Sequence, residues 1–399
     1  MFGQGRDRPG CTRFPRDNIG STNEPSAHQG EVKQMNFDIA MHVASDVFSN
    51  SFADARRKFV EMSGASRAYP SAAAGPDGES LFTDVAYFGS EHAKNLLVLV
   101  SGTHGVEGYC GSAAQLAFLK GGFREQLHSS TAVIVIHALN SYGFAWDRRV
   151  TAEGIDLNRN FIDFSESLPV NRGYEELAEN LVPKDITEEG ERRADAAIEA
   201  YRAAHGDLSF QQARVGGQYA RPGGLFYGGT EPSEARRILE SIAADYGIFS
   251  RERVVIVDYH TGLGRYGYGE LQCEQTAGID GYERAMKIFG PSVTSPCLGT
   301  SSSVMIPGTQ DAFWERSLGD RHTYVALEFG TYPSGRILRD DHWLYMYRTN
   351  EVNLELGRRI RSATRHHFYP QALDWKEMVV WRSHQVHRQA IQALAFGRG

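Results

Sequence analysis

The chain has 399 residues, enough for one large α/β domain or two ordinary ones. Hydrophobic residues make up 41% of it and charged residues 23%, and the formal net charge of -7 argues against a general nucleic-acid binder. The four cysteines form no CxxC pair, and no apolar run approaches the roughly 20 residues that span a bilayer. The N-terminus also lacks the apolar core of a secretion signal. We therefore expect a cytoplasmic protein that binds neither nucleic acid nor membrane, and its oligomeric state stays open.

The first 34 residues are rich in Gly, Pro, Arg, Asn and Ser and have hardly any apolar periodicity. A segment of this composition cannot bury enough surface to offset the entropy it would lose on ordering. We expect residues 1–34 to be a disordered extension and residues 35–399 to form one domain. Met35 could be the true start of the protein.

From Met35 onward, helical and strand-like patterns alternate. Continuous apolar runs such as residues 95–100 are typical of strands that helices cover on both faces. In chain order, the pattern predicts a helix over 52–63, strands over 84–88 and 95–100, a helix over 112–120, a strand over 132–139, a helix over 187–206, and strands over 253–259 and 324–329. Such alternation indicates an α/β sandwich with a largely parallel sheet.

The segment 211–232 contains six glycines and is predicted to be a loop. It also carries Tyr219, Phe226 and Tyr227, which is an unusual number of aromatic side chains for a surface loop. The loop therefore either lines a functional site or lies on the surface.

Polar residues follow the predicted strands at their carboxyl ends. His104 and Glu107 come after the strand 95–100, Asn158 and Arg159 lie beyond the strand 132–139, and His260 and Glu328 lie at or near the ends of the last two strands. In open α/β sheets, ligands bind in the crevice outside the carboxyl ends of the strands. We expect these side chains to converge.

The spacing of His104 and Glu107 suits a metal ion. Residues three positions apart in a tight turn can point at one ion, and the neighbouring glycines 102, 105 and 108 allow the backbone to bend around it. Catalytic zinc takes three protein ligands and leaves one position open, and His260 is well placed as the third. Taken alone, however, an HxxE pair is common, and His260 could be a hydrogen-bonded structural histidine.

The combined motifs resemble the zinc carboxypeptidase superfamily, which also includes the succinylglutamate desuccinylase and aspartoacylase enzymes. The resemblance runs from about residue 84 to 345, and DLNRNF is its most specific piece. SGTHGVEGYCGSAAQ, FADARRKF and GGLFYGG look like a bacterial branch whose substrate is not assigned. The motifs, in order, are HGVEG, RVTAEGIDLNRNF (149–161), DYHTGLG (258–264) and ALEFG (326–330).

This resemblance implies a three-layer α/β/α sandwich with a mixed, largely parallel central sheet. It also implies one Zn²⁺ per chain, held by His104, Glu107 and His260. Glu328 would be the general base that takes a proton from the attacking water and passes it to the leaving amine. Arg149, rather than Arg148, would stabilise the oxyanion.

Other positions match the family's substrate contacts. Asn158 and Arg159 match the pair that grips the substrate carboxylate, with Tyr227 as a further candidate contact. Asp156 matches the carboxylate that orients a zinc-bound histidine. We expect the side chain of Asp258 to face away from His260. For the family's catalytic tyrosine, Tyr227, Tyr266, Tyr268 and Tyr332 remain open candidates.

These patterns predict a zinc-dependent hydrolase that cleaves an amide bond next to a carboxylate of a peptide or small-molecule substrate. The same motifs fit a carboxypeptidase and an N-acyl amino acid deacylase. A serine hydrolase would need a GxSxG nucleophile elbow, and the sequence contains none. A non-catalytic binding protein of the same fold is the remaining alternative.

Overall fold

The computed structural model describes residues 46–275, 280–333, 336–348 and 354–397. The chain divides into two compact units, Met1–Met41 and His42–Gly399, and all of the described residues belong to the second. The predicted extension 1–34 lies outside the described residues, so its disorder stays a prediction.

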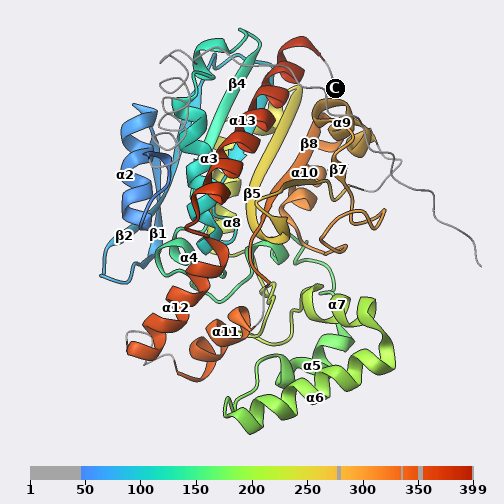
Figure 1. The fold of residues 1–399 in the computed structure, drawn as a ribbon. Helices are drawn as coiled ribbons and strands as arrows, with labels where there is room; N and C mark the ends of the chain where they lie inside the picture. Colours follow the sequence, from blue (N-terminus) through green and yellow to red (C-terminus); the bar gives the residue numbers. More distant parts are fainter. Residues whose placement is uncertain (1–45, 276–279, 334–335, 349–353, 398–399) are drawn as a thin grey trace, which may run out of the picture. The chain divides into compact units, whose positions relative to one another are not determined.

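An eight-stranded sheet forms the centre of this unit (Figure 1). The strand order is β1-β2-β4-β3-β5-β8-β6-β7. The strands are β1 (Arg67–Ala74), β2 (Ser80–Phe88), β3 (Asn95–Val100), β4 (Thr131–His137), β5 (Arg253–Tyr266), β6 (Gly269–Gln272), β7 (Val293–Thr294) and β8 (His322–Gly330).

The four middle strands, β4, β3, β5 and β8, run parallel to one another. Antiparallel pairs join β1 to β2, β2 to β4, and β6 to β8, whereas β6 and β7 are parallel. The sheet is therefore mixed with a parallel centre. Because the middle strands share one direction, their carboxyl ends lie at the same edge of the sheet.

Helices cover both faces of the sheet. The α-helices are α2 (Phe52–Ser63), α3 (Gly108–Lys120), α4 (Ser141–Ala145), α5 (Arg172–Leu181), α6 (Glu188–His205), α7 (Asp207–Val215), α8 (Glu234–Asp245), α9 (Asp280–Phe289), α10 (Gln310–Leu318), α11 (Ile337–Tyr347), α12 (Glu355–Phe368) and α13 (Leu373–Phe396). Short 3-10 helices are η1 (Gly105–Glu107), η2 (Arg124–Gln126), η3 (Leu157–Arg159), η4 (Ile248–Ser250) and η5 (Gly319–Arg321).

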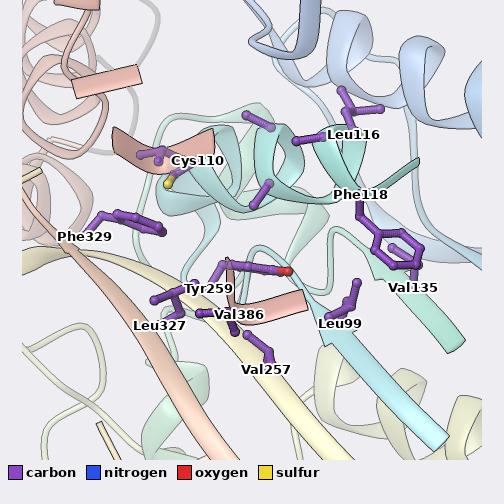
Figure 2. Close-up of a cluster of buried hydrophobic side chains, with 14 of the residues drawn as sticks. Leu99, Cys110, Leu116, Phe118, Val135, Val257, Tyr259, Leu327, Phe329 and Val386 are labelled. Carbon is purple, nitrogen blue, oxygen red and sulfur yellow. The ribbon is translucent and has the colours of Figure 1, made fainter. Parts of the chain in front are cut away.

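The core has one layer of side chains on each face of the sheet. On one face, α2, α3, α9 and α13 pack over the strands. Figure 2 shows part of this cluster, with Cys110, Leu116 and Phe118 on α3 and Leu99 and Val257 on the strands. On the other face, α8 and α10 pack against residues such as Ile134 and Ile256. This arrangement confirms the expected three-layer α/β/α sandwich.

A separate cluster of buried side chains joins α5 and α7 to α11 and α12. In Figure 1, α5, α6 and α7 lie together, apart from the sheet and near α11. Tyr174, Leu177 and Leu181 of α5 supply much of this small core, together with Phe226 and Trp343. These helices form a wall beside the carboxyl ends of the strands.

The predicted helices and strands are present, and most differences concern their ends. The prediction of a loop over 211–232 was wrong for residues 211–215, which are the last residues of α7. The helix over 52–63 and the strand over 95–100 have the expected bounds, and Thr187 caps α6 by accepting from the backbone N–H of Gly190. Helix α3 begins four residues before the predicted start, and β5 continues seven residues beyond the predicted end. Within the described residues, no helix is long and apolar enough to cross a membrane.

Candidate metal site

The site is assembled from three strand ends. After β3, the chain turns into η1, so that His104 precedes this 3-10 helix and Glu107 ends it. His260 lies on β5 and is the register partner of Glu328 on β8. Gly105 is required at the turn, because a Cβ there would lie 2.1 Å from the carbonyl carbon of Gly143.

His104, Glu107 and His260 converge through the Nδ1 atoms of both histidines and the two carboxylate oxygens of Glu107. The Nδ1 of His104 is 3.0 Å from Oε1 of Glu107 and 3.2 Å from Nδ1 of His260, which is itself 3.1 Å from Oε2 of Glu107. All three side chains are buried. Among the described residues, His104, Glu107 and His260 are the cluster of His, Cys, Asp or Glu side chains that could hold a metal ion.

The donor set fits zinc. Bonds of about 2.0–2.1 Å in a tetrahedral site place ligand atoms roughly 3.3 Å apart, and two imidazole nitrogens with one carboxylate oxygen are a common zinc ligand set. The two Nδ1 atoms here are 3.2 Å apart, and each lies 3.0 or 3.1 Å from a different carboxylate oxygen of Glu107. All three residues line one pocket, from which a metal ion held by them would be accessible.

Each histidine turns its other ring nitrogen toward a buried aspartate. The Nε2 of His104 is 3.1 Å from Oδ1 of Asp156, and the Nε2 of His260 is 2.9 Å from Oδ2 of Asp258. The aspartates orient the rings so that both Nδ1 atoms face the same point. Burial lowers the pKa of His260, but the charge and hydrogen bond of Asp258 outweigh it and hold that pKa well above its ordinary value.

The expectation for Asp258 was wrong. Asp258 and His260 are two residues apart on β5, and side chains with that spacing share a face of the strand. Alternation separates adjacent positions, so it turns Tyr259 rather than Asp258 to the opposite side. Tyr259 accordingly packs in the core under α3 (Figure 2).

Glu328 lines the same pocket as His104, Glu107 and His260 but is not one of the three residues that could hold a metal ion. Its Oε1 accepts a hydrogen bond of 2.9 Å from the backbone N–H of Leu263. Burial and the charge of Glu107 raise the pKa of Glu328 to about 8. Burial also opposes ionisation of Glu107, but His104, His260 and Arg149 hold the pKa of Glu107 well below its ordinary value. Two neighbouring carboxyl groups thus differ strongly in proton affinity.

Arg149 spans the site from the strand-end loop. Its Nη1 donates to Oε1 of Glu107 and its Nε donates to Oδ2 of Asp156, both at 2.9 Å. Its Nη2 is 2.8 Å from Nε2 of His104. The guanidinium lines the pocket, where it offers positive charge next to the point on which the ligand atoms converge.

Asn158 and Arg159 form the next part of the pocket wall, in η3. The Oδ1 of Asn158 accepts from the backbone N–H of Gln310 at 2.8 Å. The Nε and Nη2 of Arg159 donate to the carbonyl of Val215 at 3.2 and 2.7 Å, and its Nη1 donates to the carbonyl of Asn158. A guanidinium has five N–H groups, so Arg159 keeps two beyond these three bonds.

The pocket has a volume of about 320 Å³, at the lower end of the roughly 300–1,000 Å³ usual for small-molecule sites. The glycine-rich loop does reach it, through Phe226. Tyr227 is buried outside the lining, and its carbonyl accepts from the backbone N–H of Asp156. The tyrosines 227, 266, 268 and 332 are all absent from the pocket lining among the described residues.

Several lining residues belong to no sequence motif, although Arg214 lies within the segment 211–232 that was a candidate for the lining. Phe210 and Arg214 come from α7, and Leu338 comes from α11. Glu274 follows β6, and burial together with the charge of Asp311 raises its pKa to about 7. Only their tertiary position brings them to the site.

Residues 48–382 match the family described as Protein of unknown function (DUF2817). The chain belongs to the DUF2817 family. A comparison with curated proteins finds no match.

Several solved structures are similar to this DUF2817 member. Bovine thrombin-activatable fibrinolysis inhibitor, in complex with a tick carboxypeptidase inhibitor, is 13% identical over 80% of this chain and 98% of its own, with a TM-score of 0.42. Carboxypeptidase A from Helicoverpa armigera is 11% identical over 83% and 81%, with a TM-score of 0.41. Succinylglutamate desuccinylase from Chromobacterium violaceum is 14% identical over 82% and 76%, with a TM-score of 0.35.

Proposed function

We propose that this protein is a zinc-dependent hydrolase that cleaves an amide bond next to a substrate carboxylate. The observation that supports it is the convergence of His104, Glu107 and His260, with Glu328 left unliganded beside them. Three ligands with a free carboxylate at a pocket wall are what metal-assisted hydrolysis requires.

When bound, zinc would make a water nucleophilic near neutral pH and polarise the scissile carbonyl. Glu328 would accept a proton from the attacking water at its carboxylate and return it to the leaving amine. Burial and the charge of Glu107 raise the pKa of Glu328 to about 8. A carboxyl group with a pKa near neutrality can both accept a proton from water and give it to the leaving amine. The backbone N–H of Leu263 keeps one of its oxygens fixed.

Arg149 would stabilise negative charge that develops on the carbonyl oxygen. A preorganised donor of this type supplies about 3–4 kcal/mol of transition-state stabilisation. Its two carboxylate partners hold the guanidinium in place before substrate arrives. Asn158 and Arg159 would hold the substrate's carboxylate, using the side-chain amide and the two remaining N–H groups of the guanidinium.

The test is a screen of the purified, zinc-loaded protein against peptides and N-acyl amino acids, with detection of newly formed amines. Release of an amine that stops on chelation and returns with zinc supports the proposal. Peptide cleavage at the carboxyl terminus would identify a carboxypeptidase, and release of an acyl group would identify a deacylase. Zinc binding without turnover of any substrate class would favour a non-catalytic binding protein.

A further inference from the structure

The long helix α13 presents one exposed face along its length. In Figure 1, α13 (red) runs across the front of α3 and the sheet, and its inner face packs into the core through residues such as Trp375, Val379 and Val386. Exposed side chains recur on the outer face at alternating intervals of four and three residues, the spacing of a seam between two paired helices. We call these residues the α13 stripe: Asp374, Met378, Trp381, Gln385, Arg388 and Gln392.

The centre of the α13 stripe is apolar. Trp381 is 66% exposed and Met378 is 44% exposed. Tyr268, between β5 and β6, is 49% exposed and lies next to Gly267, over which Met378 packs. Tryptophan side chains are buried on average, and tryptophan is enriched among the residues that dominate protein–protein binding. An exposed tryptophan beside a methionine and a tyrosine therefore indicates a surface that another protein covers.

Opposite charges lie at equal distances from Trp381 along the helix. Asp374 is seven residues before it and Arg388 is seven residues after it, and seven residues are close to two helical turns, so all three face the same way. Within residues 46–275, 280–333, 336–348 and 354–397, neither charged side chain belongs to an ion pair. Asp374 accepts from the backbone N–H of Trp375, and Arg388 donates to the side-chain amide of Gln392.

Two cations beside the stripe are held by their own chain. The ammonium of Lys376 lies over the rings of Phe48 and Tyr369 and donates to Gln371. The guanidinium of Arg382 donates to the carbonyl of Gly269. The charges that the stripe itself offers to a partner are therefore those of Asp374 and Arg388.

This pattern is complementary to itself. If two copies of α13 pair antiparallel about a two-fold axis at Trp381, Asp374 of each copy lies opposite Arg388 of the other, and Met378 lies opposite Gln385. A parallel pair would instead place like charges against each other. An interface that uses one patch of both subunits is the commonest type in homo-oligomers, and it requires this reciprocal matching.

We propose that the protein is a homodimer in which the α13 stripes of two copies pair antiparallel, with Trp381 at the two-fold axis. The apolar centre would be excluded from water, and the two ion pairs at the ends would determine the direction of pairing. Among the described residues, those that line the candidate metal pocket include none from α13. The proposal is thus independent of the proposed function.

The experiment is analytical ultracentrifugation of the full chain over a range of concentrations, which gives the Kd of the dimer. The variants are Trp381→Ala, Asp374→Arg and Arg388→Asp, together with an equimolar mixture of the two charge reversals. Arg192→Asp is the matched control, since Arg192 is exposed on α6. The Tm of each variant checks that it is folded, and hydroxyl-radical footprinting of Met378 and Trp381 locates the interface.

We expect a dimer in wild type and in Arg192→Asp, with Met378 and Trp381 protected. Trp381→Ala should weaken the dimer by roughly thirtyfold or more, as for a central tryptophan. Each charge reversal should weaken it roughly ten- to a hundredfold, because two attractive pairs become two repulsive ones. The mixture should recover the dimer, because each introduced charge then meets its opposite on the other chain.

Three results would overturn the proposal. Wild type could sediment as a monomer at every concentration, the dimer could be insensitive to the variants, or the mixture of charge reversals could stay monomeric. A monomer in which Met378 and Trp381 are nevertheless protected would assign the stripe to another segment of the same chain, which also overturns it.

Discussion

His260 and Asp258 face each other on the same side of β5, with His260 Nε2 2.9 Å from Asp258 Oδ2. The aspartate is fully buried and also accepts hydrogen bonds from Thr103 Oγ1 at 2.8 Å and from the Tyr324 hydroxyl at 3.0 Å. These donors hold the carboxylate in place, and the carboxylate holds the ring of His260. The direction in which the Nδ1 of His260 points thus depends on Thr103, Asp258 and Tyr324, which do not line the pocket.

Asp258→Asn should weaken zinc binding by about ten- to a hundredfold, because metal ligands depend on such hydrogen-bond partners for their orientation. Competition with a chelator of known affinity measures the change. Asp156→Asn, which alters the partner of His104, should act in the same direction. Asp185→Asn serves as the control, since that residue is exposed. Zinc affinity equal to wild type in Asp258→Asn would contradict the orienting role.

His104→Ala and His260→Ala should each lose the metal, whereas wild type should bind about one zinc per chain. Each substitution removes one of three converging ligand atoms. Metal analysis after gel filtration measures the content. His128→Ala is the control, because His128 is exposed and contacts Ser130 instead. Full occupancy in either ligand variant would refute the assignment.

Glu328→Gln should keep zinc but lose turnover by a factor of about 10²–10⁴, the usual contribution of a general base. The amide oxygen can still accept from Leu263, so the side chain should stay in place. Single-turnover kinetics and metal content are measured on the same sample. Glu270→Gln is the matched control, since Glu270 pairs with Glu328 across β6 and β8 but does not line the pocket. A near-normal rate in zinc-loaded Glu328→Gln would mean that another group takes the proton.

The sequence predicted the strands that carry the site because their signal is local. The apolar run of β3 has the same bounds in the structure, and the polar residues after each parallel strand meet at one edge of the sheet. Strand β1 was missed, because RAYPSAAA has few large apolar residues and contains Pro70, which an edge strand tolerates.

The walls of the pocket could be predicted only in part: the segment 211–232 was a candidate for the lining, but the sequence did not show which of its residues face the pocket. Arg214 lies on a short helix 46 residues before His260, and no local pattern distinguishes it from other surface arginines. Its position depends on the packing of α5 and α7 and on the hydrogen bonds from Arg159 to Val215. Such contacts join distant segments, so they become visible only in three dimensions.

Stability should fall as the pH falls from about 6.5 toward 3, partly through His137. Burial lowers the pKa of His137 to about 3, whereas an unfolded histidine has a pKa near 6.5. Between these values the unfolded chain binds a proton that the folded chain excludes. The free energy of unfolding therefore decreases by up to about 1.4 kcal/mol per pH unit from this residue.

His137→Gln should flatten this dependence. Urea unfolding at pH 7, 6 and 5 measures it as a change of slope, independently of any loss of stability that the substitution itself causes. The dependence should not vanish, because the pKa of the buried His387 is lowered as well. His128→Gln, at an exposed site, should keep the wild-type slope. An unaltered slope in His137→Gln would assign the acid sensitivity to other groups.

Arg159 combines two possible roles, and substrate analogues separate them. If its two remaining N–H groups hold the substrate carboxylate, wild type should cleave an amidated analogue poorly, with a loss on the order of 2–3 kcal/mol or roughly a hundredfold in kcat/KM. Arg159→Ala should lose about as much on the free acid and little more on the amide, because both changes remove the same interaction.

If Arg159 instead acts only by holding the end of α7 through Val215, its loss should disturb the pocket for both substrates alike. The losses from substitution and from amidation would then multiply, which would contradict the carboxylate grip. Arg159→Lys should separate the two roles further: a lysine keeps the positive charge but lacks the planar fork that can donate to Val215 and to a carboxylate together. Recovery of the free-acid preference in Arg159→Lys would identify charge, rather than the position of α7, as the decisive contribution.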